Sequence, residues 1–312
     1  DAGGVFREAM SRIVEDLFSE QFNLLLLCPN AQQAVHSNMD KYLPNPQYVA
    51  SSALGLEMFK FIGKLMALSI RTKLYLPFEF PPIIWKKLVG EAVGVDDLMG
   101  VDAIVTKQLA SIRSWDLEKV DPTKLKFEYV GSDKVERELI PGGRALEVTY
   151  ENREEYCDAV VAARLREFDA AVEAMSSGIE EVIPTRAVLL FSGVQLEELV
   201  CGSPTFDLDL WRRNTDSTGV SPRTIQLFWE VMGTLTQQEL SGFVRFAWGR
   251  SRLPPAKEFT VKMRLTSGGR AVLPVSHTCF FSVELPEYQT EEKMRHGLLT
   301  AIHYGVGGIL NG

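Results

Sequence analysis

Residues 53–74, ALGLEMFKFIGKLMALSIRTKL, form the longest apolar run of the chain. A membrane-spanning helix needs about 20 consecutive apolar residues. Glu57, Lys60 and Lys64 interrupt this run on successive helical turns, and charged side chains at the centre of a span are costly. The run therefore predicts a core helix of a soluble protein and no membrane span.

The size and composition of the chain are typical of a soluble protein with more than one folded unit. The 312 residues are 46% hydrophobic and 24% charged, and they are enough for two hydrophobic cores. The formal net charge of -8 argues against broad nucleic-acid binding, which needs a basic surface. The chain starts at Asp1 without Met or a leader-like segment, so we expect it to be an excised portion of a longer polypeptide.

The four cysteines, Cys28, Cys157, Cys201 and Cys279, show no CxxC spacing. This pattern favours neither a disulfide framework nor a zinc site, and we expect no metal and no organic cofactor. Free thiols are typical of proteins in a reducing compartment. We therefore predict that the protein is cytoplasmic, with the nucleus as a further location.

The first two thirds of the chain predict mainly helices with one small sheet. Segments 124–131 and 145–150 alternate like strands on either side of a Pro-Gly-Gly turn. A single long helix is expected to follow, with Asn152 as its N-cap and Gly178 at its C-cap. This part therefore predicts a helical body with a small α/β subdomain.

The polar stretch 211–224, WRRNTDSTGVSPRT, marks a change in the character of the sequence. Gly219 and Pro222 lie within it, and such stretches commonly separate domains. We place a hinge there. The segments predicted beyond it are a helix opened by a Thr236–Glu239 capping box, strands at 259–265 and 280–285, and a last helix over 291–304 capped by Thr290.

Cys279 lies in a short polar turn between two of these strand-like runs, in the segment SHTCFF. A thiolate is a good nucleophile, but an ordinary cysteine is only a few per cent ionised at about pH 7, so its surroundings must help. His277 and Thr278 precede the thiol and could polarise it or stabilise an oxyanion. From these residues alone, a buried and inert cysteine remains the commoner alternative.

Five motifs in this order resemble a HECT-type ubiquitin ligase catalytic domain over essentially the whole chain. The motifs are FKFIGKLMALSIRTK in the first half, FW at 228–229, GRSRLP at 249–254, LPVSHTCF, and LPEY. The pairing of WGRSRLP with two phenylalanines after the cysteine is most similar to the large HERC-type ligases.

The resemblance implies an α+β, bilobal fold. A mainly helical N-terminal lobe would span 1–216, with a conjugating-enzyme-docking subdomain at about 100–180, a hinge at 217–223 and a compact α/β catalytic lobe at 224–312. The side chains expected to anchor the conjugating enzyme are Trp115, Leu125, Phe168, Val172 and Met175.

The resemblance also implies the chemistry. Cys279 would accept ubiquitin from a ubiquitin-conjugating enzyme as a thioester and pass it to a lysine of a protein substrate, with no cofactor. His277 and Thr278 would support the oxyanion of each acyl transfer. Lysine attack also calls for a base or an orienting carboxylate, and Glu284 and Glu287 follow the thiol closely, although exposed solvated glutamates are common.

Two positions depart from the family pattern. Phe281 stands where family members commonly carry Asn, and Ile309 stands where many carry a Phe near the C-terminus.

Two other functions stay open at this point. A papain-like cysteine hydrolase would pair Cys279 with His296 or His303 as base, although such folds usually place the Cys early in the chain. A non-catalytic binding module would leave Cys279 without a role.

Overall fold

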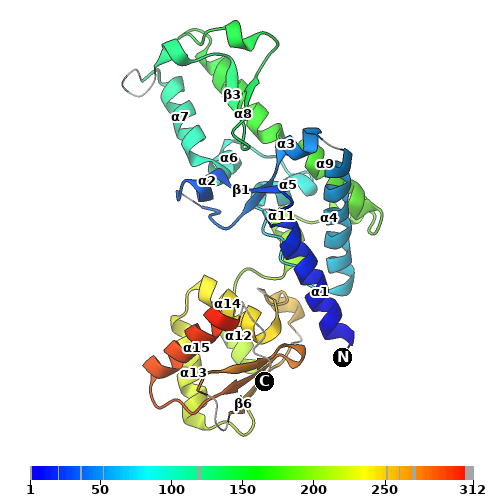
Figure 1. Ribbon diagram of the computed structural model, residues 1–312, viewed down its shortest axis with the longest axis vertical. Coiled ribbons are helices and arrows are strands. Elements are labelled where there is room, and N and C mark those ends of the chain that lie inside the picture. The colour runs from blue at the N-terminus through cyan, green and yellow to red at the C-terminus, as the bar shows by residue number, and fades with distance from the viewer. Residues whose placement is uncertain are drawn as a thin grey trace. The chain divides into compact units, whose positions relative to one another are not determined.

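The computed structural model describes residues 2–19, 21–35, 37–51, 53–116, 118, 121–250, 252–259, 261–268 and 272–305. The chain folds into two compact units, both drawn in Figure 1. We call them unit 1, which comprises Asp1–Val14, Thr72–Pro77 and Glu198–Gly312, and unit 2, which comprises Glu15–Arg71 and Phe78–Glu197. The mixture of helices and small sheets is compatible with the α+β class.

Unit 2 is mainly helical. Its helices are α2 (Pro29–Gln32), α3 (Pro46–Ser51), α4 (Ala53–Thr72), α5 (Pro82–Leu88), α6 (Val95–Val101), α7 (Ala103–Arg113), α8 (Arg153–Arg166), α9 (Asp169–Glu180), α10 (Thr185–Val188) and most of α11 (Gly193–Cys201), with 3-10 turns η1 (Pro122–Lys124) and η2 (Gly143–Ala145). Two short antiparallel hairpins complete it, β1 (Leu25–Leu27) with β2 (Tyr42–Pro44), and β3 (Glu128–Val130) with β4 (Glu136–Glu138).

The predicted core helix is confirmed as α4, but only one of its faces is buried. Phe59, Ile62 and Met66 are fully buried, whereas Leu54 and Phe61 are exposed. Among the helices that the structure describes, none is both long and apolar enough to cross a membrane.

Helices α4 and α9 pack with their backbones in close approach. A Cβ atom built on Gly63 would lie 1.9 Å from the Met175 carbonyl oxygen, and one built on Gly178 would lie 1.9 Å from the Lys60 carbonyl oxygen. Gly178 is therefore not the predicted C-cap. It lies inside α9, where glycine is required by the neighbouring helix.

The single helix predicted after Asn152 is also wrong, because the chain breaks it into α8 and α9 at Glu167 and Phe168. Phe168 is fully buried and begins the second helix. The Glu167 side chain turns inward to Arg164, with 3.1 Å between Oε1 and Nε. The break thus places an aromatic ring and a carboxylate inside unit 2.

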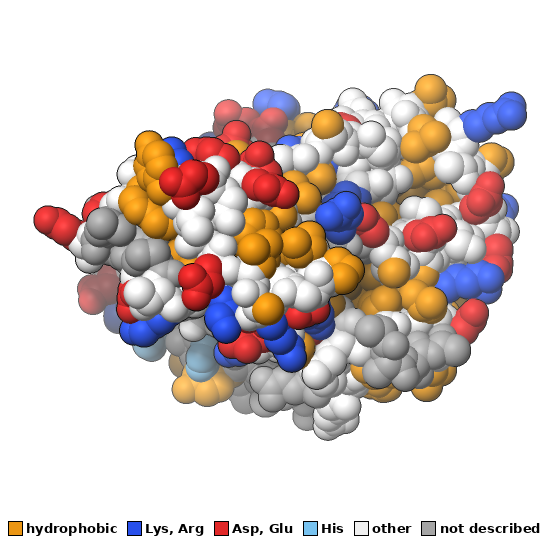
Figure 2. All heavy atoms as spheres, turned by 90° about the horizontal axis from the view of Figure 1, so that it is seen from above, with side chains coloured by type: hydrophobic (Ala, Val, Ile, Leu, Met, Phe, Trp, Pro, Cys, Tyr) orange, Lys and Arg blue, Asp and Glu red, His pale blue; other side chains and the backbone are white. Residues whose placement is uncertain are grey.

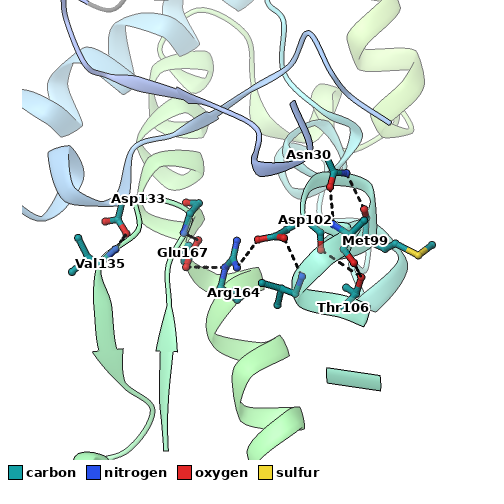
Figure 3. Close-up of polar contacts among 11 residues, drawn as sticks. Asn30, Met99, Asp102, Thr106, Asp133, Val135, Arg164 and Glu167 are labelled. Carbon is teal, nitrogen blue, oxygen red and sulfur yellow. Dashed lines mark hydrogen bonds and ion pairs between the residues drawn. The ribbon is translucent and has the colours of Figure 1, made fainter. Parts of the chain in front are cut away.

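A buried polar cluster joins α8 to the start of α7 and to the β3–β4 hairpin (Figure 3). Arg164 Nη1 lies 2.9 Å from Asp102 Oδ2, and the Arg164 side chain is 1% exposed. The Ser132 N–H donates to Glu167 Oε2 over 3.2 Å. Removing one partner from such a buried network leaves an uncompensated charge, so the cluster fixes these elements to each other.

The small subdomain forms around its own apolar cluster. Its buried members are Leu109, Ile112, Phe127, Val148, Tyr156, Cys157 and Val160. The predicted strand at 124–131 is confirmed in part as β3, but its partner is β4 rather than 145–150, which forms one isolated bridge between Lys126 and Glu147.

Unit 1 contains a four-stranded sheet of order β5-β6-β8-β7. The strands are β5 (Thr215–Asp216), β6 (Met263–Ser267), β7 (Val275–His277) and β8 (Ser282–Leu285). β6 runs parallel to β5 and β8, while β7 and β8 are antiparallel. The helices of this unit are most of α1 (Ala2–Leu17), α12 (Leu208–Arg213), α13 (Pro222–Thr234), α14 (Gln237–Trp248) and α15 (Glu291–Gly305), with 3-10 turns η3 (Ala256–Glu258) and η4 (Thr278–Phe280).

Helix α15 packs on both α13 and α14 (Figure 1). Helix α14 also contacts β7 and β8. The predicted helix starts are confirmed where the side chains cap the backbone. The Glu239 N–H donates to Thr236 Oγ1 over 3.2 Å and the Thr236 N–H donates to Glu239 Oε2 over 2.7 Å. The Lys293 N–H donates to Thr290 Oγ1 over 3.3 Å.

Arg250 is one of the residues that bind the segment Thr72–Pro77 within unit 1. Arg250 Nη1 donates to the Lys73 carbonyl oxygen over 3.3 Å, and its guanidinium lies 4.2 Å from the Trp248 ring centroid. Such cation–π contacts are favourable when partly desolvated.

The predicted hinge at 217–223 lies within unit 1. Just before it, β5 already pairs with β6, so Asp216 shares a sheet with the predicted catalytic lobe. Gly219 has a φ of +87°, and a Cβ atom there would meet nothing within 4 Å. The lobe boundaries at 216 and 224 remain predictions.

Charges of both signs are intermixed on the face drawn in Figure 2, where Lys and Arg side chains lie near Asp and Glu side chains. Ion pairs of this kind join α4 to the end of α9. Lys60 Nζ and Lys64 Nζ each lie 2.6 Å from a Glu181 carboxylate oxygen.

Candidate functional site

The backbone of Cys279 lies in η4, the turn that joins β7 to β8 at the edge of the unit 1 sheet. The side chain of Cys279 lies outside the described part of the structure. The turn is anchored on both sides, because His277 at the end of β7 pairs with Ser282 at the start of β8. The structure thus places the residue in a short, strand-flanked turn.

Phe281 ends this turn in a left-handed backbone conformation, with φ 47° and ψ 52°. Non-glycine residues rarely adopt this region, and Asn does so more easily than most. The Phe281 ring is buried and stacks on Trp248 at 5.2 Å and on Trp211 at 6.2 Å between ring centroids. The departure from the family's Asn is therefore compensated by burial of an aromatic ring between two indoles.

The two residues predicted to support the thiol, His277 and Thr278, are both exposed. His277 Nε2 lies 3.1 Å from Glu284 Oε1, across the β7–β8 pair. The structure therefore brings together two of the residues that the sequence analysis named separately. Glu287 is exposed after β8.

An open cleft of about 270 Å³ lies beside the turn. Phe280, which directly follows Cys279, lies at the edge of the cleft and is 74% exposed. The residues that line the cleft are Asp216, Lys262, Met263, Arg264, His277, Phe280 and Ser282. The cleft therefore combines an apolar ring, charges of both signs and an imidazole next to the turn.

Sequence reasoning missed Asp216, Lys262 and Arg264 as members of this site. Asp216 and Arg264 reach it because β5 and β6 pair in parallel, with Asp216 opposite Arg264. Arg264 Nε lies 3.7 Å from Asp216 Oδ2, and a hydrogen bond from the Thr218 hydroxyl is the main cause that lowers the pKa of Asp216. The alternation of apolar and polar residues in the sequence MRLTS, residues 263–267, is the signal that could have placed Arg264 on the open face.

The other three cysteines are buried and make no disulfide. Burial raises the pKa of Cys28 to about 12 and that of Cys157 to about 11. Cys201 is 1% exposed. Thiols in such surroundings are poor nucleophiles. Among the side chains that the structure describes, no group of His, Cys, Asp or Glu has the arrangement of a metal site.

His296 and His303, the bases considered for a hydrolase, both lie on α15 and are at least partly exposed. His303 contacts Tyr304 edge-on, with 4.9 Å between ring centroids. Of the histidines within the described ranges, the cleft is lined by His277 alone. Ile309 lies outside the described residues.

Three of the five expected anchors for a conjugating enzyme are core residues. Phe168, Val172 and Met175 are all buried, so they cannot contact a partner. Trp115 and Leu125 are partly buried against the subdomain cluster. The helical spacing that suggested an apolar face thus marked the inside of unit 2.

Comparison with known proteins gives matches over nearly the whole chain. Residues 11–310 match a family model described as HECT-domain (ubiquitin-transferase). The chain is 32% identical over 313 residues to the E3 ubiquitin-protein ligase HERC2 of Homo sapiens, covering 97% of this chain and 6% of the relative. It is 30% identical over 323 residues to the E3 ubiquitin-protein ligase ptr1 of Schizosaccharomyces pombe, covering 99% of this chain and 10% of the relative.

A shorter relative is the probable E3 ubiquitin-protein ligase hulA of Aspergillus terreus, which is 29% identical over 324 residues. This alignment covers 98% of this chain and 38% of the relative. The chain therefore spans well under half the length of each of these curated relatives.

Proposed function

The chain belongs to the HECT-domain (ubiquitin-transferase) family, and on that premise we propose that Cys279 carries ubiquitin as a thioester between a conjugating enzyme and a substrate lysine. The family membership confirms the resemblance drawn from the sequence motifs. The observation that carries the assignment to Cys279 is the burial of the other three cysteines, which leaves the thiol in the strand-flanked turn as the candidate nucleophile.

Two acyl transfers use the same sulfur. In the first, the Cys279 thiolate attacks the thioester carbonyl carbon of the charged conjugating enzyme, whose own thiolate leaves. In the second, a neutral lysine amine attacks the new thioester, the carbon–sulfur bond breaks, and an amide forms. Each step passes through an oxyanion, for which Thr278 with its backbone N–H is the candidate donor, while His277 is the candidate for exchanging the proton.

We propose that the conjugating enzyme docks on the small subdomain through side chains other than the buried ones. Exposed apolar residues of this region are Val130, Ile140, Leu146 and Tyr150. Apolar and aromatic side chains on a polar surface suit a modest, transient interface. A bilobal, hinged domain suits this chemistry because the same thiol must face a donor first and an acceptor later.

The proposed setting is the cytoplasm, with the nucleus as a further location, and the proposed partners are ubiquitin, a conjugating enzyme and a protein substrate. Substrate choice would rest on parts of the longer relatives that this chain does not span.

The test is a charging assay with purified chain, ubiquitin and a panel of charged conjugating enzymes. We expect a ubiquitin adduct on non-reducing gels that disappears with thiol reductant and is absent in Cys279→Ala. The control Cys201→Ala keeps all residues of the turn and should charge normally. An adduct that survives Cys279→Ala, or none with any conjugating enzyme, would contradict the proposal.

The same assay separates the two alternatives. Hydrolysis of a ubiquitin amide without conjugating enzyme would favour a cysteine hydrolase. Binding of ubiquitin without any adduct would favour a non-catalytic module.

A further inference from the structure

The unit 1 sheet has one apolar face and one polar face. On β6, Met263 and Leu265 are fully buried, while Arg264 between them is exposed. On β8, Val283 and Leu285 are buried in the same core. Since successive side chains of a strand point to opposite faces, Arg264 and Glu284 lie on the face away from that core.

A row of polar residues crosses the sheet on this open face. Asp216 pairs with Arg264, Arg264 pairs with Ser282, and Ser282 pairs with His277. The four residues come from four different strands, and all of them line the cleft beside η4. The row ends at His277, two residues before Cys279.

Glu284 lies next to this row and contacts its last member. Because His277 is opposite Ser282, Glu284 is its diagonal neighbour on β8, and the Nε2 to Oε1 distance is 3.1 Å. A carboxylate accepts hydrogen bonds only, so in a neutral imidazole Nε2 carries the proton. Nδ1 is then the nitrogen with a free lone pair, as occurs where a carboxylate fixes a histidine tautomer.

The remaining charged groups around His277 belong to the same cleft. Asp216 on β5 and Arg264 on β6 face each other, and Lys262 precedes β6. One carboxylate and two cations thus line the cleft with the imidazole, and the Glu284 carboxylate is the charged group that bonds to it directly.

We propose that Glu284 is a positioning residue that holds His277 with Nδ1 free to accept the proton lost by the acceptor amine during transfer from Cys279. This inference rests on the proposed ubiquitin transfer and assigns its acid–base partner. The amine attacks the thioester carbonyl, its proton passes to His277 Nδ1, and Cys279 leaves as thiolate. The imidazolium then returns the proton to water.

A purely structural role predicts a different behaviour. A cross-strand pair on an exposed face contributes to β7–β8 pairing, and its loss would change stability without changing how the rate depends on pH. The pH profile of discharge therefore distinguishes the two roles.

The experiment isolates the second transfer. Chain precharged with ubiquitin on Cys279 is separated from the conjugating enzyme and mixed with a lysine-containing peptide over a range of pH. Loss of the thioester is followed on non-reducing gels. The variants are Glu284→Gln, Glu284→Asp and His277→Gln, and the matched control is Glu292→Gln, an exposed carboxylate on α15.

We expect Glu284→Gln, Glu284→Asp and Glu292→Gln to charge, and His277→Gln to charge on longer incubation to an extent that lets its discharge be followed. Glu284→Gln should slow discharge about tenfold, as loss of an orienting partner commonly does, and should change the pH–rate profile because the imidazole is no longer held in one orientation. His277→Gln should slow discharge about a hundredfold and flatten the profile, as loss of a general base does. Glu284→Asp should recover part of the rate, and Glu292→Gln should match the parent chain.

Normal charging with an unchanged rate and midpoint in Glu284→Gln would overturn the inference while leaving the proposed function intact. Failure of the parent chain to charge at all would instead overturn the proposed function. If Glu284→Gln is unfolded at the assay temperature, His277→Gln provides the test: a flattened pH–rate profile supports the inference, and a profile equal to that of the parent chain overturns it.

Discussion

The ring of Phe281 stacks on the indole of Trp248 with 5.2 Å between their centroids, while the Phe281 backbone holds a left-handed φ of 47°. The two features oppose each other energetically. The backbone conformation costs about 1–2 kcal/mol for a residue with a Cβ atom, whereas burial of a large ring contributes more than that. Because Phe281 directly follows η4, this balance sets the geometry of the turn that contains Cys279.

Substitution of Phe281 should separate these two contributions. Phe281→Ala removes the buried ring and keeps the strained backbone, so we expect the free energy of unfolding to fall by about 3 kcal/mol. Phe281→Gly removes the ring as well but relieves the strain, so it should be at least as stable as Phe281→Ala. Urea denaturation measures both. A glycine variant clearly less stable than the alanine variant would contradict the argument, because that is the order seen at ordinary backbone angles.

The close approach of α4 and α9 predicts that neither Gly63 nor Gly178 tolerates a methyl group. Each Cβ atom would lie 1.9 Å from a carbonyl oxygen of the other helix, so the helices must separate. We expect Gly63→Ala and Gly178→Ala each to destabilise the chain by about 3 kcal/mol in urea denaturation.

Gly233 provides the matched control for these two substitutions. It also lies inside a helix, α13, but a Cβ atom there would meet nothing within 4 Å. Gly233→Ala should therefore stabilise the chain by about 0.5–1 kcal/mol, because alanine is the better helix former. Equal effects at all three glycines would show that helix propensity, rather than packing, decides the outcome.

The helix starts could be predicted from the sequence because they depend on neighbours a few residues apart. Thr236 caps its own helix, and its partner Glu239 is three residues away. Gly178 could not be assigned in this way, since its role depends on Lys60, which is distant in the chain. The polar row of the cleft was missed for the same reason, because it depends on pairing between strands that are distant in the sequence, such as that of Asp216 with Arg264.

The family motifs located the candidate site better than local chemistry did. SHTCFF alone left a reactive and an inert cysteine both open. In the structure Cys28, Cys157 and Cys201 are buried, which narrows the choice of the nucleophilic cysteine. The structure also adds the contact between His277 and Glu284. The anchors expected at Val172 and Met175 failed because helical spacing does not reveal which side of a helix faces the core.

Alkylation should discriminate among the four cysteines. Burial raises the pKa of Cys28 to about 12 and that of Cys157 to about 11, and Cys201 is also buried, so these three thiols should be nearly inert in the native chain. We expect iodoacetamide at about pH 7 to label Cys279 alone, as read by peptide mass spectrometry. Unfolded chain should be labelled at all four positions. Native labelling at Cys28 or Cys157 would contradict the burial that supports Cys279 as the nucleophile.

Glu167 makes the stability of the chain depend on pH. Burial raises the pKa of this carboxyl above its ordinary value of 4.5, against the opposing charge of Arg164. Between the ordinary and the raised pKa, the native state binds more protons than the unfolded state. The stability contributed by Glu167 is therefore complete below about pH 4.5 and is lost as pH rises through the raised pKa.

Glu167→Gln removes this titration and keeps an oxygen that can accept from the Ser132 N–H. We expect the free energy of unfolding of the variant, relative to the parent chain, to increase as pH rises from about 4.5 towards 7, even if the variant is less stable at every pH. Urea denaturation at several pH values measures the difference. The control is Glu155→Gln, which makes the same change in charge at an exposed residue of helix α8. It should not show this trend. A relative stability of Glu167→Gln that falls with rising pH would show that the ion pair with Arg164, rather than burial, dominates the carboxyl.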